Sequence, residues 1–154
     1  MSRLRQCVVA ALVVMSLAGA VVCLGQQKPE RKSTDIQVWA IRATTKNKEI
    51  SKELRELADK LKRDFKFTGF KLEQRASGSA AIGKAYSTSL TGGYQANVTP
   101  KSNDGKQVKL QVEVLKGKDS KLNTTVTVKA GQFQLLGGMS LDGGDQLIVA
   151  VSAK

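Results

Sequence analysis

Most of the chain alternates between apolar and polar residues, which is the pattern of half-buried β-strands. The alternation is regular over residues 108–114 and 122–128, where Val and Leu are interleaved with Lys, Gln and Thr. Residues 35–43 are apolar on both faces, which predicts a central strand of a sheet. The segment 147–153 (LIVAVSA) predicts a second central strand, whereas the Ser-, Thr- and Ala-rich segment 80–90 predicts an edge strand.

One segment near the start of the domain has a helical period instead. Apolar residues recur there at steps of three and four: Ile50, Leu54, Leu57, Ala58, Leu61 and Phe65. This stripe predicts an amphipathic helix from Lys48 to about Lys66, with Asn47 or Ser51 capping its start. Because an exposed stripe would leave its apolar side chains in water, we expect the helix to lie on the sheet.

The order of these elements defines the expected fold class. A strand and a helix come first, and strands separated by Gly- and Asn-rich turns follow, including a hairpin signal at Asn103-Asp104-Gly105. Short turns join antiparallel neighbours. The sequence therefore predicts one α+β domain over residues 35–154. It is an antiparallel sheet or sandwich of about eight short strands with one amphipathic helix on a face.

The first 25 residues have the three-part pattern of a secretory signal peptide. Arg3 and Arg5 form a short positive region, and an uncharged apolar run follows over residues 7–22. Small residues then offer two cleavage positions, after Ala20 and after Gly25. This pattern predicts a periplasmic or extracellular protein.

Two further readings concern the same end of the chain. Residues 7–24 are 18 residues long, close to the lower limit of about 17 for a membrane span, so an uncleaved N-terminal membrane anchor is the alternative. Residues 26–34 are polar and contain Pro29, which predicts a flexible linker between the leader and the domain.

The composition removes several classes of chemistry. The chain has no His, which excludes Ser-His-Asp catalysis and His-based metal sites. Cleavage after Gly25 would remove both cysteines, Cys7 and Cys23, and with them every thiol. Asp142 and Asp145 in a Gly-rich turn offer fewer oxygen ligands than Ca²⁺ requires. We therefore expect no metal, no cofactor and no catalytic residues, although Ser–Lys catalysis stays open.

Two local patterns resemble binding motifs. The segment Gly78–Lys84 matches most of a phosphate-binding loop, but Ala85 stands where Ser or Thr should hold magnesium, and no helical stripe follows. We interpret it as a Gly-containing β-turn and expect no nucleotide. Phe65-Lys66-Phe67 interleaves rings with a cation, as platforms for single-stranded nucleic acid do. Because Phe65 ends the helical stripe, core packing is the preferred interpretation.

A short stretch resembles a known family. Residues 126–138 (VTVKAGQFQLLGG), preceded by Leu122-Asn-Thr-Thr, are similar to the strand–Gly–strand–Gly-Gly hairpin near the C-terminus of secretin-family envelope proteins. The resemblance implies a similar hairpin over residues 122–138 and no channel function, because the chain is far shorter than a secretin. The leader, helix and β-rich body together also resemble small exported bacterial proteins.

The charge balance suggests two kinds of partner. The chain has 25 Lys and Arg against 13 Asp and Glu. Without residues 1–25, which carry Arg3 and Arg5 and no acid, 23 basic residues remain against 13 acidic ones. We expect an exported, non-catalytic binding or structural module that contacts a protein partner of unknown identity or another copy of itself. The alternative is a basic protein of the cell envelope that binds an anionic surface, namely lipid headgroups, a cell-wall polymer or nucleic acid.

Overall fold

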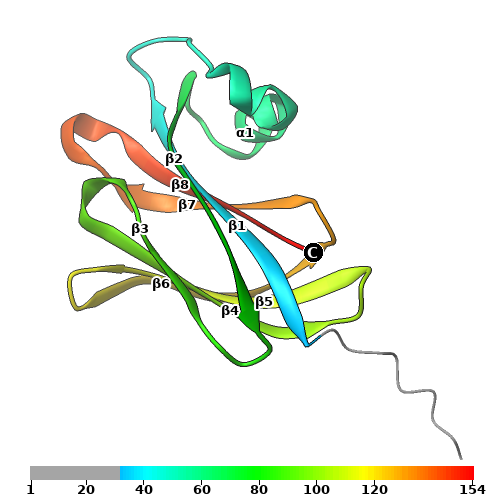
Figure 1. Cartoon of the computed structure of the whole chain (residues 1–154). Coiled ribbons are helices and arrows are strands. Elements are labelled where there is room, and N and C mark those ends of the chain that lie inside the picture. Colours follow the sequence, from blue (N-terminus) through cyan, green and yellow to red (C-terminus); the bar gives the residue numbers. More distant parts are fainter. Residues whose placement is uncertain (1–31) are drawn as a thin grey trace, which may run out of the picture.

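The alternating segments form two four-stranded antiparallel sheets that pack face to face, with the helix outside them (Figure 1). The structure is a computed structural model and describes residues 32–154. In spatial order, sheet A contains β2 (Gly69–Ala81), β1 (Ser33–Thr44), β8 (Gln146–Ala153) and β7 (Phe133–Ser140). Sheet B contains β3 (Tyr86–Ser89), β4 (Tyr94–Asn103), β5 (Gln107–Lys116) and β6 (Asp119–Lys129). The predicted fold class is confirmed.

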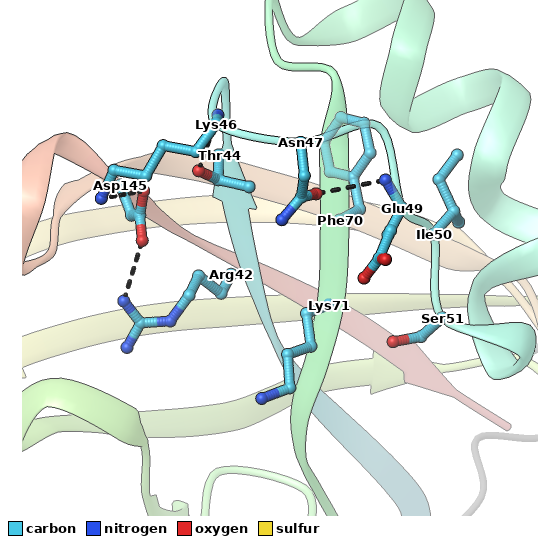
Figure 2. Close-up of a pocket in the computed structure, with 10 residues that line it drawn as sticks. All are labelled: Arg42, Thr44, Lys46, Asn47, Glu49, Ile50, Ser51, Phe70, Lys71 and Asp145. Atoms are coloured by element: carbon cyan, nitrogen blue, oxygen red, sulfur yellow. Dashed lines mark hydrogen bonds and ion pairs between the residues drawn. The ribbon is translucent and has the colours of Figure 1, made fainter.

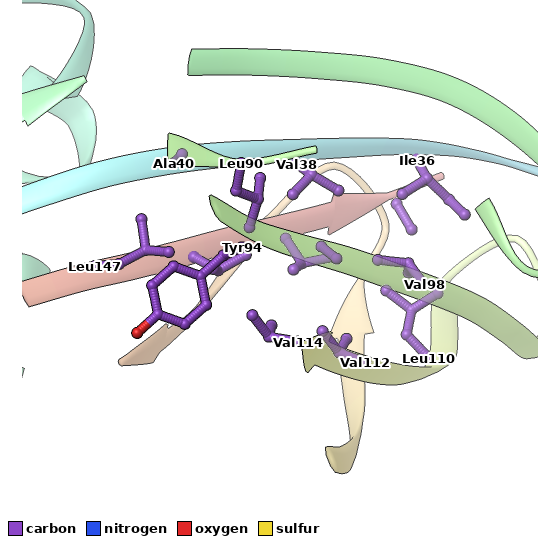
Figure 3. Packing of buried hydrophobic residues seen from close by; sticks show 14 of the residues in the cluster. Ile36, Val38, Ala40, Leu90, Tyr94, Val98, Leu110, Val112, Val114 and Leu147 are labelled. Atoms are coloured by element: carbon purple, nitrogen blue, oxygen red, sulfur yellow. The ribbon is translucent and has the colours of Figure 1, made fainter. Parts of the chain in front are cut away.

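The main core lies between the two sheets (Figure 3). Its residues are the inward positions of the predicted alternation, such as Val98 from β4 and Leu110 and Val112 from β5, all fully buried. On β6 the inward residues Leu122 and Val126 are only partly buried, because β6 is an outer strand of sheet B. The alternation therefore identified the core-facing side of each strand, and the position of the strand in the sheet sets how deeply it is buried.

The predicted helical stripe covers the outer face of sheet A. Leu54, Leu57 and Leu61 pack there in a second apolar cluster with residues of the central strands, including Trp39 and Ile148. The segment is shorter than predicted: a 3₁₀ turn spans Lys52–Leu57 and α1 spans Ala58–Asp64. The expected packing of the stripe on the sheet is confirmed.

Ile50 and Ser51, which were predicted to form the first turn of the helix, bind to β2 instead. Ile50 forms a parallel bridge with Phe70 of β2. The Ser51 hydroxyl accepts a hydrogen bond from Leu72 N–H at 3.0 Å, and no side chain caps the 3₁₀ turn. Asn47 Oδ1 accepts from Glu49 N–H at 3.1 Å. Ser51 stands at the N-cap position of the 3₁₀ turn, but its hydroxyl bonds to β2, and the Asn47 side chain bonds within its own loop. The prediction that one of these side chains caps the helix was therefore wrong.

The predicted places of three strands are also confirmed. Strands β1 and β8 are the central strands of sheet A, and β3 is an outer strand of sheet B. Strand β3 is only residues 86–89 of the predicted strand 80–90, because residues 80–81 end β2 and a turn follows. Strand β1 begins at Ser33, two residues earlier than predicted, because Thr34 is buried and accepts a hydrogen bond from Asn103 Nδ2 at 3.0 Å. This bond joins β1 of sheet A to the end of β4 in sheet B.

The predicted leader over residues 1–25, with its cleavage positions Ala20 and Gly25, lies outside the described residues. So do residues 26–31 of the predicted linker. Over residues 32–154, no helix is long and apolar enough to cross a membrane.

The hairpin implied over residues 122–138 needs a correction. Both strands and the intervening turn are present, and Gly131 in that turn has φ +79°. However, β6 pairs with β5 in sheet B, whereas β7 pairs with β8 in sheet A. The Gly131 turn therefore carries the chain from one sheet to the other and closes the sandwich instead of making a hairpin. Local sequence defines the turn, but the partner strands are set by the apolar faces that each sheet must bury.

Candidate functional site

A groove of about 560 Å³ opens at the end of sheet A, where β1 ends and β2 begins (Figure 2). Its walls come from the end of β1, the loop that follows β1, the first residues of β2 and the residue that precedes β8. Charged side chains from these segments converge on it, among them Arg42, Lys46, Lys71 and Asp145. The groove is therefore built by segments that lie about 100 residues apart in the chain.

The charges at the groove form a continuous chain of alternating sign. Lys46 Nζ lies 3.4 Å from Asp145 Oδ1, and Asp145 Oδ2 lies 3.2 Å from Arg42 Nη1. Arg42 Nε lies 3.1 Å from Glu73 Oε1, and Lys71 Nζ lies 3.7 Å from the same oxygen. Glu73 stands at a register shift between β1 and β2, and such bulges redirect side chains. Both carboxylates are thus shared between two cations.

These contacts hold Arg42 and Asp145 in their charged forms. The pKa of Asp145 is lowered, chiefly by the hydrogen bond from the Thr44 hydroxyl and further by Arg42 and Lys46, against the opposing effect of desolvation. The pKa of Arg42 is raised, first by its hydrogen bond to Asp145 and then by Glu73. Ionisation is therefore stabilised at the groove, which is the property of a structural ion-pair network.

Two Gly-Gly turns of nearly identical shape border the network. They are Leu90–Tyr94, between β3 and β4, and Leu141–Asp145, between β7 and β8. Gly92 has φ/ψ of 79°/20° and Gly143 has 74°/18°. In each turn the N–H of the leucine donates to the carbonyl of the fifth residue, at 2.7 Å in the first turn and 2.9 Å in the second. The shared Leu-x-Gly-Gly sequence therefore encodes one turn used twice.

The two turns touch each other across the sheets. A Cβ on Gly92 would lie 2.5 Å from Leu141 Cδ2, and Tyr94 Oη donates to Ser140 O at 2.7 Å. This contact joins sheet B to sheet A directly beside Asp145. Sequence reasoning placed Asp145 in a turn but missed its partnership with Arg42. The available clues were the repeated Leu-x-Gly-Gly and an Arg within an otherwise apolar strand.

The segment that resembles a phosphate-binding loop is part of the sheet. Strand β2 continues to Ala81, and Lys84 N–H closes a turn on Ala81 O at 2.9 Å. Gly83 has φ +82°, and the segment after the turn is strand β3. Gly78 is where the Tyr86 ring approaches β2, because a Cβ there would lie 2.3 Å from Tyr86 Cε2. The interpretation as a Gly-containing turn is confirmed.

The other sequence candidates have structural positions. Phe65 and Phe67 are partly buried against the helix–sheet cluster and Phe70 is 1% exposed within it, so the core interpretation is confirmed. Asp142 lies in the turn before β8, and Asp145 is engaged in the ion-pair network. Over residues 32–154, three or more acidic side chains do not gather in an arrangement that could hold a metal ion.

A second candidate surface is the outer face of sheet B. Its side chains are exposed or half-buried and carry hydroxyl, amide and ammonium groups, and Gln111 Nε2 donates to Asn123 Oδ1 at 3.3 Å across β5 and β6. Residues 82–131, which form this sheet and its turns, contain eight lysines against the three acids Asp104, Glu113 and Asp119. Sheet B and its turns therefore carry a larger excess of basic over acidic residues than the rest of the described chain, which contains the groove.

Comparisons with known proteins give one distant structural relationship. No family model matches the chain, and no curated protein matches its sequence. The chain is similar in structure to the T2SS secretin XcpQ from Pseudomonas aeruginosa, with 13% sequence identity and a TM-score of 0.38. The match covers 79% of this chain and 55% of that chain, so this protein spans about half the length of the secretin chain. The weak resemblance to secretins is confirmed, and a match at this level assigns no function.

Proposed function

We propose that this chain is an exported, non-catalytic binding module of the cell envelope that contacts a protein partner or another copy of itself. The observation that carries the proposal is the ion-pair network in the groove. A general acid or base works best with a pKa close to the operating pH. The pKa of Asp145 is lowered and the pKa of Arg42 is raised, so both move away from the operating pH. We therefore assign the ion pairs of the groove the role of holding β1, β2 and β8 together.

The binding part of the proposal is supported by the outer strands of the two sheets. Edge strands present unpaired N–H and C=O groups, which other chains bind by adding a strand. Strand β6 pairs with β5 on one side only and contains 11 residues, none of which is proline. A register shift interrupts the strand at Lys121, and the eight residues from Leu122 to Lys129 offer a partner a regular ladder of backbone hydrogen bonds.

The export part rests on the leader pattern and is tested by fractionation. The full chain is expressed in a bacterial host, and its intact mass is measured in the cytoplasmic, periplasmic and secreted fractions. We expect a chain that begins at Val21 or Gln26, recovered outside the cytoplasm. A full-length chain that starts at Met1 in the cytoplasm would contradict export, and one that starts at Met1 in the membrane fraction would select the anchor alternative.

Binding is tested by cross-linking in the intact envelope with an amine-reactive reagent. We expect the chain in species heavier than the monomer, joined through lysines of residues 82–131. If cross-linking leaves it at monomer mass and the purified chain also sediments as a monomer at every concentration, the binding proposal is wrong. Hydrolysis of a substrate that is lost in Asp145→Asn would overturn the non-catalytic part.

A second candidate function is polyanion binding, favoured by the eight lysines of residues 82–131. Binding of that kind releases counterions, so its affinity falls linearly with salt on logarithmic axes. Heparin, anionic vesicles and DNA are the probes, each titrated at several salt concentrations. Binding that weakens steeply with salt would support this function over protein binding. Binding that is absent or independent of salt would remove it.

A further inference from the structure

Three turns and the start of β1 lie together at the end of the sandwich opposite to the groove (Figure 1). They comprise residues 32–35, 82–86, 100–109 and 129–132, which we name the basic end. Hydrogen bonds join these segments to one another: Ile82 N–H to Lys32 O, Gly83 N–H to Pro100 O, Asn103 Nδ2 to Thr34 Oγ1 and Ala130 N–H to Lys106 O. Segments of both sheets are thus held side by side.

The basic end carries six lysines against two acids. The lysines are all exposed: Lys32, Lys84, Lys101, Lys106, Lys109 and Lys129. The ion pairs between described side chains lie elsewhere, at the groove, on α1 and at the start of β6. Both acids have local hydrogen-bond partners. Asp35 accepts from the Ser79 hydroxyl, and Asp104 accepts from the N–H groups of Lys106 and Gln107.

The cations at the opposite end are used within the protein. Arg42 and Lys46 share the carboxylate of Asp145, and Arg42 and Lys71 share that of Glu73. Charges that are compensated by close neighbours contribute little to the field that a distant partner meets. The basic end, rather than the groove, is therefore the surface that attracts anions.

The residues of the basic end fit a broad anionic surface better than a nucleic-acid strand. Its cations are all lysines, which act as flexible point charges, whereas arginine provides bidentate recognition of phosphate. Binding of single-stranded nucleic acid also uses rings on which bases stack. Tyr86 is the one aromatic residue of the basic end, and its ring packs against β2, where a Cβ on Gly78 would lie 2.3 Å from Tyr86 Cε2. The surface thus offers charge without a stacking platform.

The place of the basic end in the chain favours lipid among the anionic surfaces. Lys32 belongs to this end, and the apolar run over residues 7–24 stands seven residues before it. Seven residues span at most about 25 Å. While the apolar run lies in a membrane, before cleavage or as the alternative anchor, the basic end is therefore close to the headgroups. Lys28 and Arg31 add two cations against Glu30 in the same stretch.

We propose that the basic end binds the anionic lipid headgroups of a membrane. The proposal rests on the proposed export and on polyanion binding, the second candidate function, and it names the surface and the ligand. Lysines close to an anionic bilayer are attracted by its negative surface potential. Strand β1 runs over 12 residues, about 40 Å, from the basic end to the groove. In this orientation the groove faces away from the membrane and stays accessible to a protein partner.

Vesicle binding tests the ligand. The chain recovered outside the cytoplasm is titrated with vesicles of phosphatidylcholine alone and with vesicles that contain phosphatidylglycerol in equal amount, at low and at high salt. We expect binding to the anionic vesicles only, and weaker binding at high salt because salt screens exposed charges. Equal binding to both kinds of vesicle, unaffected by salt, would overturn the proposal.

Removal of lysines tests the surface. One variant combines Lys84→Gln, Lys106→Gln and Lys129→Gln. Because each lysine near an anionic membrane contributes roughly a factor of five in affinity, we expect this variant to bind anionic vesicles roughly 100-fold more weakly.

The matched control removes three exposed lysines from other parts of the surface and has the same net charge: Lys52→Gln, Lys62→Gln and Lys118→Gln. It should bind within about twofold of the unmodified chain, because charges beyond a Debye length from the membrane are screened. Equal weakening in the two variants would mean that net charge alone drives binding, and would overturn the assignment to the basic end.

Fluorescence quenching tests the orientation. Cys7→Ser and Cys23→Ser remove the native thiols, and a fluorophore is attached to Ala130→Cys or to Ser120→Cys. Both positions are exposed, and they lie at opposite ends of β6. On anionic vesicles with spin-labelled headgroups, we expect strong quenching of the label at position 130 and weak quenching at position 120. Equal quenching, or stronger quenching at position 120, would contradict the proposed orientation.

Three outcomes separate this inference from the proposed function. Binding to heparin or DNA that exceeds vesicle binding, and that is lost with the lysines of the basic end, would overturn lipid as the ligand. Absent vesicle binding together with a cross-linked protein partner would overturn this inference and support the binding module. Vesicle binding by a chain that cross-links to nothing and stays monomeric would support this inference and overturn protein binding.

Discussion

Arg42 Nη1 lies 3.2 Å from Asp145 Oδ2, which joins a central strand of sheet A to the Gly-Gly turn before the other central strand. The Asp145 side chain is 11% exposed, so this contact is largely shielded from water. Two further groups, Thr44 and Lys46, stabilise the same carboxylate. The pair fixes the end of the sandwich at which the two sheets meet through their turns.

The pH dependence of stability should report on Asp145. Because its pKa is lowered in the folded state, its contribution is fully present above the ordinary value of 3.8 and is lost as the pH falls through the lower, folded value. Urea unfolding of the wild type and Asp145→Asn should therefore differ at pH 7 and converge in strong acid. Asp142→Asn, exposed in the same turn, should change stability by less than about 0.5 kcal/mol. A wild-type advantage that persists unchanged in strong acid would contradict this role.

The contact between the two turns should make Gly92 more sensitive to substitution than Gly93. Both have positive φ, 79° and 77°, so alanine strains the backbone at either position. Only at Gly92 would the added Cβ meet another side chain, Leu141, whereas Gly93 faces open space. We expect Gly93→Ala to cost about 1–2 kcal/mol of unfolding free energy and Gly92→Ala about 1 kcal/mol more, measured by urea unfolding. Equal losses of unfolding free energy in the two variants would show that the two turns are not in close contact.

Gly78 should matter for packing and not for phosphate. Gly78→Ala brings a Cβ against the Tyr86 ring and should destabilise the fold by about 1–3 kcal/mol. Combining it with Tyr86→Ala removes the clash. The double variant should therefore lose less unfolding free energy than the two single variants together, by at least about 0.5 kcal/mol. ATP with magnesium should leave the melting temperature of the wild type unchanged. A rise in melting temperature that Gly78→Ala abolishes would restore the nucleotide interpretation.

The two apolar layers should respond separately to core truncation. Trp39, the one tryptophan, lies in the helix–sheet layer, with its ring centroid 4.4 Å from that of Phe133 and Arg75 over its face. Leu61→Ala in the same layer and Leu110→Ala between the sheets should each cost about 2–5 kcal/mol. Only Leu61→Ala should change the native tryptophan emission. A change of the same size in Leu110→Ala would mean that the layers are coupled.

The elements that sequence predicted best are those whose pattern follows from burial on one face. Val108, Leu110, Val112 and Val114 alternate with polar residues, and all four are fully buried. Strands β1 and β8 were recognised as central because they must be apolar on both faces, one toward sheet B and one toward the helix. Periodicity carries this information because it depends only on neighbours in the same strand.

The features that could not be predicted from the sequence depend on contacts between segments that lie far apart in the chain. Ile50 satisfies the helical period, yet it pairs with Phe70, since sheet A gives its backbone a better partner than a first helical turn. Residues 126–138 read as a hairpin, yet β7 pairs with β8. Arg42 and Asp145 stand 103 positions apart, and nothing local to either residue identifies the other. The candidate site was missed for this reason.

The most direct test of the central claim, that this chain acts by contacting another chain, is amine-reactive cross-linking of the exported protein in the intact envelope, with the mass of every cross-linked species measured. The purified chain is sedimented over a range of concentrations as the second measurement. The account predicts cross-linked species heavier than the monomer. A chain that stays at monomer mass after cross-linking and sediments as a monomer at every concentration would contradict it.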